Sequence, residues 1–213
     1  MAGARSLRVM RELPMFPLGH PLVPHAGVPL HVFEERYRAL MRDCLEGDRL
    51  FGVVMIERGS EVGGGDVRTG VGTLARIVEA EELDDGRWVL IAVGVRRLRV
   101  AEWLPDDPYP RATVEELEDE DGMPGDGFRD ELVRSVRRIS ALRSELGDPS
   151  APLDLELADD TMAAGYQAAA AVGLGSMDLQ RLLEIDGPAD RLDAIATALD
   201  DLEELLRMRI AGG

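Results

Sequence analysis

The chain has 213 residues, of which 45% are hydrophobic and 31% charged, as in an ordinary soluble globular protein with one large domain or two small lobes. Its basic residues are all arginine, and the absence of lysine excludes a Walker A loop, a Schiff-base lysine and a Ser-Lys dyad. The net charge of −17 disfavours a nucleic-acid partner, and the single Cys44 cannot form an intrachain disulfide.

Two long uncharged stretches do not predict membrane-spanning helices. Residues 13–33 contain five prolines, and residues 161–177 are short and rich in Ala and Gly. No uninterrupted apolar run follows the N-terminal arginines, so the sequence lacks the pattern of a signal peptide. We therefore expect no membrane partner and a cytoplasmic location.

Residues 11–117 predict a β-rich lobe with one inserted helix. Two short apolar segments, 13–18 and 28–33, are interrupted by prolines, which favours edge strands. From Glu34 the spacing changes to that of a helix, which Gly47 ends, and residues 50–56 form an apolar strand. The glycine-rich residues 57–70 predict a loop. The apolar positions of the helix are Tyr37, Leu40, Met41, Cys44 and Leu45.

The second half of this lobe predicts a meander of strands. A strand over 71–83 and another over 88–93 flank the turn 84–86, whose Asp-Gly pair is typical of a hairpin. In residues 97–100 the alternation predicts that Leu98 and Val100 face inward while Arg97 and Arg99 face water. With a last strand over 111–117, this pattern favours a small barrel or two packed sheets.

An acidic linker over 118–127 separates this lobe from a predicted helical lobe over 128–211. The first helix runs from Phe128 to a stop at Gly147 and is expected to be capped by Asp126. Asp159 or Asp160 is expected to cap a second helix, and Ser176 a third. Pro188 suits the first turn of a fourth helix. The buried stripe of that last helix is predicted to hold Leu192, Ile195, Leu199, Leu202, Leu206 and Ile210.

The residues that could carry chemistry do not form a catalytic or metal-binding motif. His20, His25 and His31 lie close together and Glu34 follows them, but the intervening prolines impose no register that would gather the side chains on a metal. Cys44 lies on an apolar helix stripe, and no serine lies in a Gly-x-Ser-x-Gly elbow. We expect no metal, no cofactor and no enzymatic activity.

Several segments resemble the N-terminal, substrate-binding domain of the Lon protease family. The most specific are Leu13-Pro-Met-Phe-Pro-Leu-Gly, Val28-Pro-Leu-His-Val-Phe-Glu-Glu-Arg-Tyr-Arg-Ala-Leu and Arg49-Leu-Phe-Gly-Val-Val. Further similar segments are Gly72-Thr-Leu-Ala-Arg-Ile, Gly94-Val-Arg-Arg-Leu-Arg-Val and Leu182-Leu-Glu-Ile-Asp. The resemblance extends from about residue 11 to residue 210. It departs at Pro24-His25, where the family usually has Pro-Gly.

The resemblance implies an α+β fold, with a PUA-like pseudo-barrel that contains one inserted helix and is followed by a helical bundle. It also implies a free-standing copy of a domain that engages protein substrates, without the ATPase and protease domains. The positions that match the family motif, and for which it implies a structural role, are Pro17, Pro29, His31, Glu34, Arg36 and Gly52.

These observations lead to one main hypothesis and two alternatives. The main hypothesis is a non-catalytic module that binds protein or peptide clients, as an adaptor in proteolysis or quality control beside a separate protease or chaperone. The candidate contacts are Met15, Phe16, Phe33, Tyr37 and Phe51, which would instead be core residues if they are buried. The alternatives are a barrel that binds a small molecule or nucleobase and a homodimer formed through the last helix.

Overall fold

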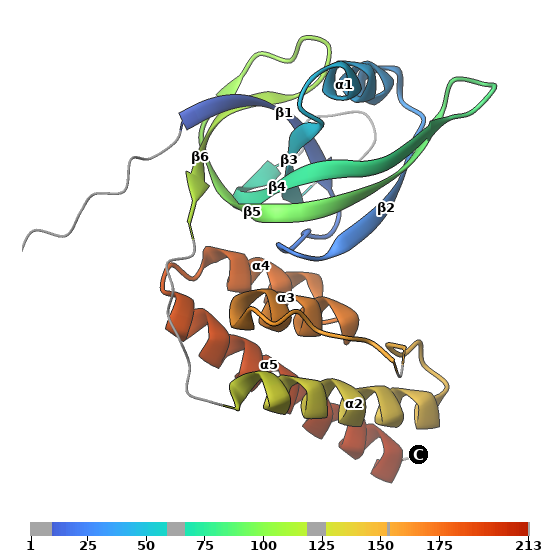
Figure 1. Ribbon diagram of the computed structural model, residues 1–213, viewed down its shortest axis with the longest axis vertical. Helices are drawn as coiled ribbons and strands as arrows, with labels where there is room; N and C mark the ends of the chain where they lie inside the picture. The colour runs from blue at the N-terminus through green and yellow to red at the C-terminus, as the bar shows by residue number, and fades with distance from the viewer. Residues whose placement is uncertain (1–9, 59–66, 119–126, 153, 213) are drawn as a thin grey trace, which may run out of the picture. The chain divides into compact units, whose positions relative to one another are not determined.

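The computed structural model describes residues 10–58, 67–118, 127–152 and 154–212. The chain divides into an N-terminal unit, Met1–Glu118, and a C-terminal unit, Asp119–Gly213 (Figure 1). The described residues form six strands and five helices, which confirms the α+β class. Most of the predicted acidic linker and of the glycine-rich loop lies outside the described residues.

The strands of the N-terminal unit close into a ring. They are β1 (Met10–Leu18), β2 (Gly27–Val32), β3 (Leu50–Arg58), β4 (Val67–Glu82), β5 (Trp88–Leu104) and β6 (Arg111–Leu117). Their order is β2-β5-β4-β3-β1-β6, and β6 also pairs with β5. The long β5 pairs with β2 over residues 88–93 and with β6 over residues 97–104, so β2 lies outside the ring.

Strand β1 is not the edge strand that its prolines predicted. Its first half, Met10–Pro14, pairs antiparallel with β6, and its second half, Met15–Leu18, pairs parallel with β3. Each half has one recorded partner strand, so the missing N–H groups of Pro14 and Pro17 can face the unpaired side. The prediction failed because the two partner strands are distant in sequence. Strand β2 is an edge strand, as predicted.

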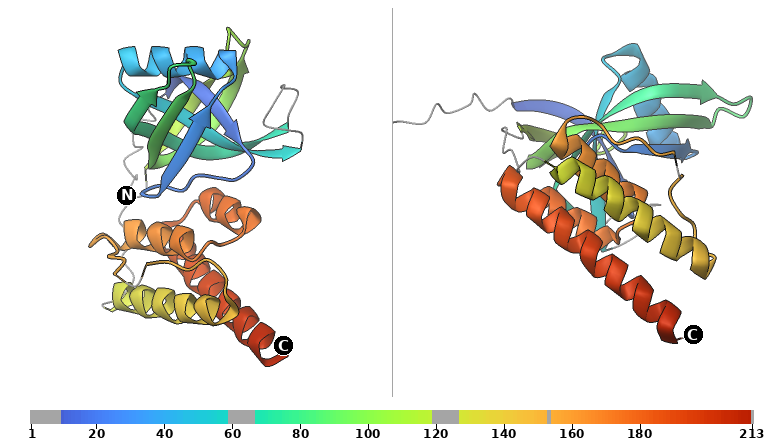
Figure 2. Two further views of the ribbon diagram at one scale, coloured as in Figure 1. Left: turned by 90° about the vertical axis from the view of Figure 1, so that its right-hand side faces the viewer. Right: turned by 60° about the horizontal axis from the view of Figure 1, so that its bottom comes forward.

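Helix α1 (Glu35–Glu46) lies across one end of the ring, as the two views in Figure 2 show. Its buried residues Tyr37, Leu40, Met41 and Cys44 match the predicted stripe. They pack with strand residues that include Phe51 to form the larger core of the unit. The hydroxyl of Tyr109 donates a hydrogen bond of 2.5 Å to Asp43, which ties α1 to the segment before β6.

Two positions in this unit depart from simple expectation. Arg97 is only 2% exposed, so the prediction that it faces water was wrong. Leu98 points into the core as predicted, so two adjacent residues of β5 are both buried at this point. His25, where the family pattern has glycine, has a φ of 61° in the left-handed region that glycine adopts most readily.

The C-terminal unit contains helices α2 (Phe128–Leu146), α3 (Thr161–Ala171), α4 (Ser176–Glu184) and α5 (Pro188–Gly212). The Asp160 side chain caps α3 by accepting a hydrogen bond from Ala163 N at 2.7 Å, as predicted. Ser176 is not a cap but the first residue of α4, which follows Gly175. Gly127 precedes α2, and the expected cap Asp126 lies outside the described residues.

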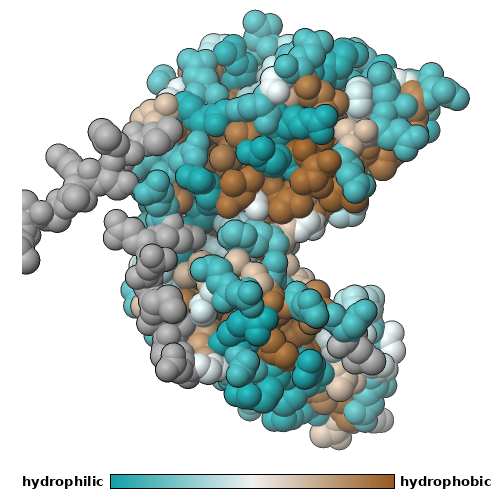
Figure 3. All heavy atoms as spheres, in the orientation of Figure 1, coloured by the Kyte–Doolittle hydropathy of each residue, from teal (hydrophilic) through white to brown (hydrophobic). Residues whose placement is uncertain are grey.

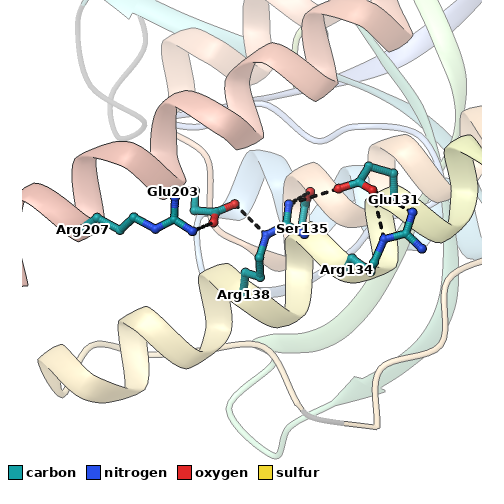
Figure 4. A network of polar contacts seen from close by, with 6 residues as sticks. All are labelled: Glu131, Arg134, Ser135, Arg138, Glu203 and Arg207. Carbon is teal, nitrogen blue, oxygen red and sulfur yellow. Dashed lines mark hydrogen bonds and ion pairs between the residues drawn. The ribbon is translucent and has the colours of Figure 1, made fainter.

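Arginine side chains stabilise this unit from within. Arg191 is fully buried, and its guanidinium donates hydrogen bonds to the carbonyl oxygens of Ile185 and Asp186 at the end of α4. Between α2 and α5, the buried Glu203 accepts a hydrogen bond from Arg138 at 2.9 Å and pairs with Arg207 (Figure 4). These contacts give hydrogen-bond partners to the carbonyl oxygens at a helix end and to a buried carboxylate, both of which are removed from water.

The same network reaches the surface of α2. Arg138 also contacts Glu131, which pairs with Arg134 one turn away (Figure 4). Hydrogen bonds from Arg134 and Arg138 lower the pKa of Glu131 below its usual value. The bundle is therefore joined by charged groups as well as by its apolar core.

Candidate functional site

A groove in the N-terminal unit lies among the end of β1, the strand β2 and the start of α1. Its volume is ≈ 230 Å³. The residues that line it are mainly aromatic and aliphatic: Phe16, Leu18, His20, Pro29, Leu30, His31, Val32, Phe33, Glu34 and Tyr37. The sequence brings them together because β2 leads directly into α1, while Phe16 and Leu18 come from the end of β1.

Two stacked aromatic rings form the inner wall of the groove, and an arginine supports them from behind the lining. The rings of Phe16 and Tyr37 stack with their centroids 4.3 Å apart, and the Arg36 guanidinium lies over the Tyr37 ring at 4.5 Å. Phe16 also meets Phe51 edge to face at 6.2 Å, which anchors the stack in the core. Such contacts add stability beyond area burial and hold this wall in place.

The rim of the groove follows from the alternation of β2. Leu30 and Val32 are buried, whereas Pro29 and His31 are exposed on the opposite face. Phe33, just beyond the strand, is 54% exposed and meets the His31 ring edge to face at 6.2 Å. An aromatic side chain this exposed is available to a partner.

The exposed face of β5 extends this rim. Pro29 pairs with Ile91 and His31 with Val89, and cross-strand partners project from the same face of a sheet. Both β5 residues are exposed, at 40% and 44%. Figure 3 shows apolar residues gathered among polar ones on the drawn face of this unit. A sizeable exposed apolar patch of this kind is typical of an interaction surface.

The polar groups around the groove offer little net charge and no activated nucleophile. The one carboxylate in the lining, Glu34, accepts a hydrogen bond from Arg36 at 3.2 Å. Burial raises the pKa of the Cys44 thiol to about 12, so this thiol is an inert core group. His20 and His31 line the groove but His25 does not, and no group of three His, Cys, Asp or Glu in the described ranges could hold a metal.

The candidate contacts predicted from the sequence fall into two groups. Phe16, Phe33 and Tyr37 line the groove, although only Phe33 is largely exposed. Met15 and Phe51 are 0% exposed, so they support the fold and offer no surface to a partner. Sequence reasoning missed the lining residues Leu18, His20, Leu30 and Val32, together with the neighbouring Val89 and Ile91.

The residues of the family motif are also divided by the structure. Pro29, His31 and Glu34 line the groove, and Arg36 supports it from the Tyr37 ring. Pro17 is buried in β1. Gly52 packs against Met15, and an added Cβ would lie 2.5 Å from the Met15 sulfur, so that side chain would have to move.

Comparison with known proteins places this chain in a family. Residues 12–201 match the model of the ATP-dependent protease La (LON) substrate-binding domain. The chain belongs to the LON substrate-binding domain family. A Lon N-terminal domain protein from Xanthomonas campestris, of known crystal structure, is 30% identical and superposes with a TM-score of 0.65, covering 88% of this chain and 98% of that one.

Relatives of known sequence are longer than this chain. The Lon protease of Trichlorobacter lovleyi is 29% identical over 95% of this chain but only 25% of its own length. A LON peptidase N-terminal domain and RING finger protein of Schizosaccharomyces pombe is 25% identical over 90% of this chain and 46% of its own length. The LON domain chain thus spans about a quarter of the Lon proteases it matches.

Within the LON domain chain, none of the helices in the described residues is long and apolar enough to cross a membrane. The match covers the substrate-binding domain and not the protease or ATPase domains.

Proposed function

We propose that this LON domain is a non-catalytic module that binds apolar segments of protein clients in the groove formed by β1, β2 and α1. The observation that carries the proposal is the largely exposed Phe33 beside the stacked wall of Phe16 and Tyr37. A partner's apolar side chain that enters the groove would displace water from the exposed Phe33 ring, beside a wall of buried aromatic side chains.

The low charge of the groove supports an apolar client. Glu34 is hydrogen-bonded to Arg36, so its charge is largely balanced where a client would lie. The unit as a whole is less acidic than the rest of the chain, since residues 1–117 hold 19 acidic residues against 15 arginines. Affinity would come from buried apolar surface rather than from charge pairing.

Strand β2 favours binding through side chains over the addition of a full strand. It is an edge strand whose described residues pair with β5 alone. An edge strand can accept an extended peptide through its backbone groups, but Pro29 lacks an N–H and interrupts that ladder. The client would therefore be held by short apolar motifs rather than by a continuous hydrogen-bonded pairing.

In this proposal the bond-breaking step belongs to another protein. The LON domain would act as an adaptor in proteolysis or quality control beside a separate protease or chaperone, in the cytoplasm. The alternative of a small ligand inside the ring is less well supported. Core side chains that are fully buried, such as Phe51, Ala75 and Leu98, fill that interior.

The test measures binding of a fluorescein-labelled, uncharged peptide rich in Phe and Leu by fluorescence polarisation, with the whole chain. Phe33→Ser should weaken binding by about tenfold, because it removes an exposed aromatic contact. The matched control is Met10→Ser, since Met10 is 50% exposed on β1 but does not line the groove. Equal affinity of the two variants, or no binding by the unaltered chain, would disprove the proposal.

A further inference from the structure

A second groove lies in the C-terminal unit, between α4 and α5. Its volume is ≈ 430 Å³. Its apolar lining comes from both helices and from the turn before α4: Leu174, Leu182, Ala194, Ala198, Leu202 and Leu205. Leu205 is 51% exposed, so the apolar surface of the groove is open to a partner.

The acidic residues at this groove have no ion-pair partner among the residues that the structure describes. Asp178 on α4 and Asp201 on α5 both line it, and neither forms an ion pair within the described ranges. Arg181 is the one basic residue of the lining. The rim is therefore negative around an apolar floor.

The charge of the whole unit has the same sign. Residues 118–213 contain 22 acidic residues and 9 arginines. Five of those arginines already pair with carboxylates inside the unit: Arg129, Arg134, Arg138, Arg207 and Arg209. The excess of negative charge is thus available to a partner outside, and it favours a cationic one.

We propose that the groove between α4 and α5 is a docking site for a cationic amphipathic helix of a partner protein. Its apolar side chains would fill the groove and its Arg or Lys residues would meet Asp178 and Asp201. A helix fits because the described part of this unit contains no strand whose edge could pair with an extended peptide. A second copy of this chain fits poorly, because it would bring an equally acidic surface.

This site differs from the client groove in both location and chemistry. The groove at β2 is apolar and nearly balanced in charge, whereas this one is apolar with an acidic rim. The chain would therefore bind clients with one unit and a basic partner helix with the other. The two sites can be tested separately.

The experiment uses a labelled amphipathic peptide with Leu at positions i, i+3, i+4 and i+7 and Arg on its other face. Its binding to the whole chain is followed by fluorescence polarisation at low and at physiological salt. The double variant Asp178→Asn/Asp201→Asn should bind about tenfold more weakly, because the loss of each rim charge should reduce the affinity roughly threefold. Its affinity should also depend less on salt.

Matched variants separate this site from general charge effects. Asp193→Asn/Asp200→Asn removes two exposed acidic residues of α5 that do not line the groove, and should leave the affinity within about twofold. Leu205→Ser should weaken binding, whereas Met177→Ser should not, because Met177 is 73% exposed on α4 outside the lining. Circular dichroism verifies that each variant is folded.

Three outcomes would overturn the proposal. They are an equal loss of affinity in both double variants, no binding of the peptide at all, and a dimer of the chain in light scattering that Leu205→Ser abolishes. Phe33→Ser should leave binding of the basic peptide unchanged, so a failure here is distinct from a failure of the client groove.

Discussion

The two units of this chain are stabilised in different ways. In the N-terminal unit the strands approach so closely that backbone meets backbone: a Cβ added at Gly72 would lie 2.1 Å from the carbonyl oxygen of Val53. The ring also buries charged groups, Arg97 and Glu115, but its strands are already joined by backbone pairing. In the C-terminal unit the elements are helices, and buried charged side chains join them: Arg191 is 0% and Glu203 5% exposed. The ring should therefore be sensitive to added volume, and the bundle to lost hydrogen bonds.

The largest effect is expected from Gly72→Ala. The methyl group would collide with the Val53 carbonyl, which is backbone and cannot move aside, so the free energy of unfolding should fall by about 3 kcal/mol. Urea unfolding followed by tryptophan fluorescence measures this unit selectively, because Trp88 and Trp103 both lie on β5. Gly70→Ala is the control, since nothing lies within 4 Å of its Cβ. Similar stabilities of the two variants would contradict the close-packed ring.

A smaller effect is expected from Arg191→Met in the other unit. Methionine fills a similar apolar space but removes the hydrogen bonds that Arg191 donates to the carbonyl oxygens of Ile185 and Asp186. The free energy of unfolding of the helical unit, measured by circular dichroism, should fall by about 2 kcal/mol. Arg209→Met removes an exposed ion pair with Asp148 and should change little. If methionine were tolerated as well at residue 191 as at 209, the bundle would not depend on its buried arginine.

The smallest effect concerns the ion pair of Glu203 with Arg138. A double-mutant cycle with Glu203→Gln and Arg138→Met should give a coupling free energy of about 1 kcal/mol, because Glu203 is buried but Arg138 is partly exposed. The coupling should weaken only slightly in 1 M salt, since a buried partner is poorly screened. A coupling near zero would mean that the apolar stripe alone joins α2 to α5.

Local patterns in the sequence predicted most of the elements. The spacing of Tyr37, Leu40, Met41 and Cys44 predicted the buried face of α1, and the Asp-Gly pair predicted the turn between β4 and β5. Such features depend on residues a few positions apart, because the periodicity of a helix or strand determines which way their side chains point. The same patterns predicted a β-rich lobe followed by a helical one, and the family resemblance implied that the first is a pseudo-barrel.

Features that depend on distant residues were not predictable in this way. The partners of β1 in the register lie 37 residues away in β3 and 97 to 105 residues away in β6, so its prolines alone gave a false edge strand. The alternation of residues 97–100 predicted an exposed Arg97, yet this side chain is 2% exposed in the fold. The sequence predicted only some of the residues that line the groove. They come from the end of β1, from β2 and from α1, and no single helix or strand periodicity relates these segments to one another.

The pairing of Met10–Pro14 with residues 111–115 also determines when the ring can form during synthesis. Strand β1 leaves the ribosome before β6 and has no antiparallel partner until β6 has been made, and contacts this distant in sequence form slowly. Until then the apolar side chains of β1 lack the neighbours that β6 provides in the folded ring. A nascent chain of this protein is itself the kind of exposed apolar polypeptide that its finished groove is proposed to bind.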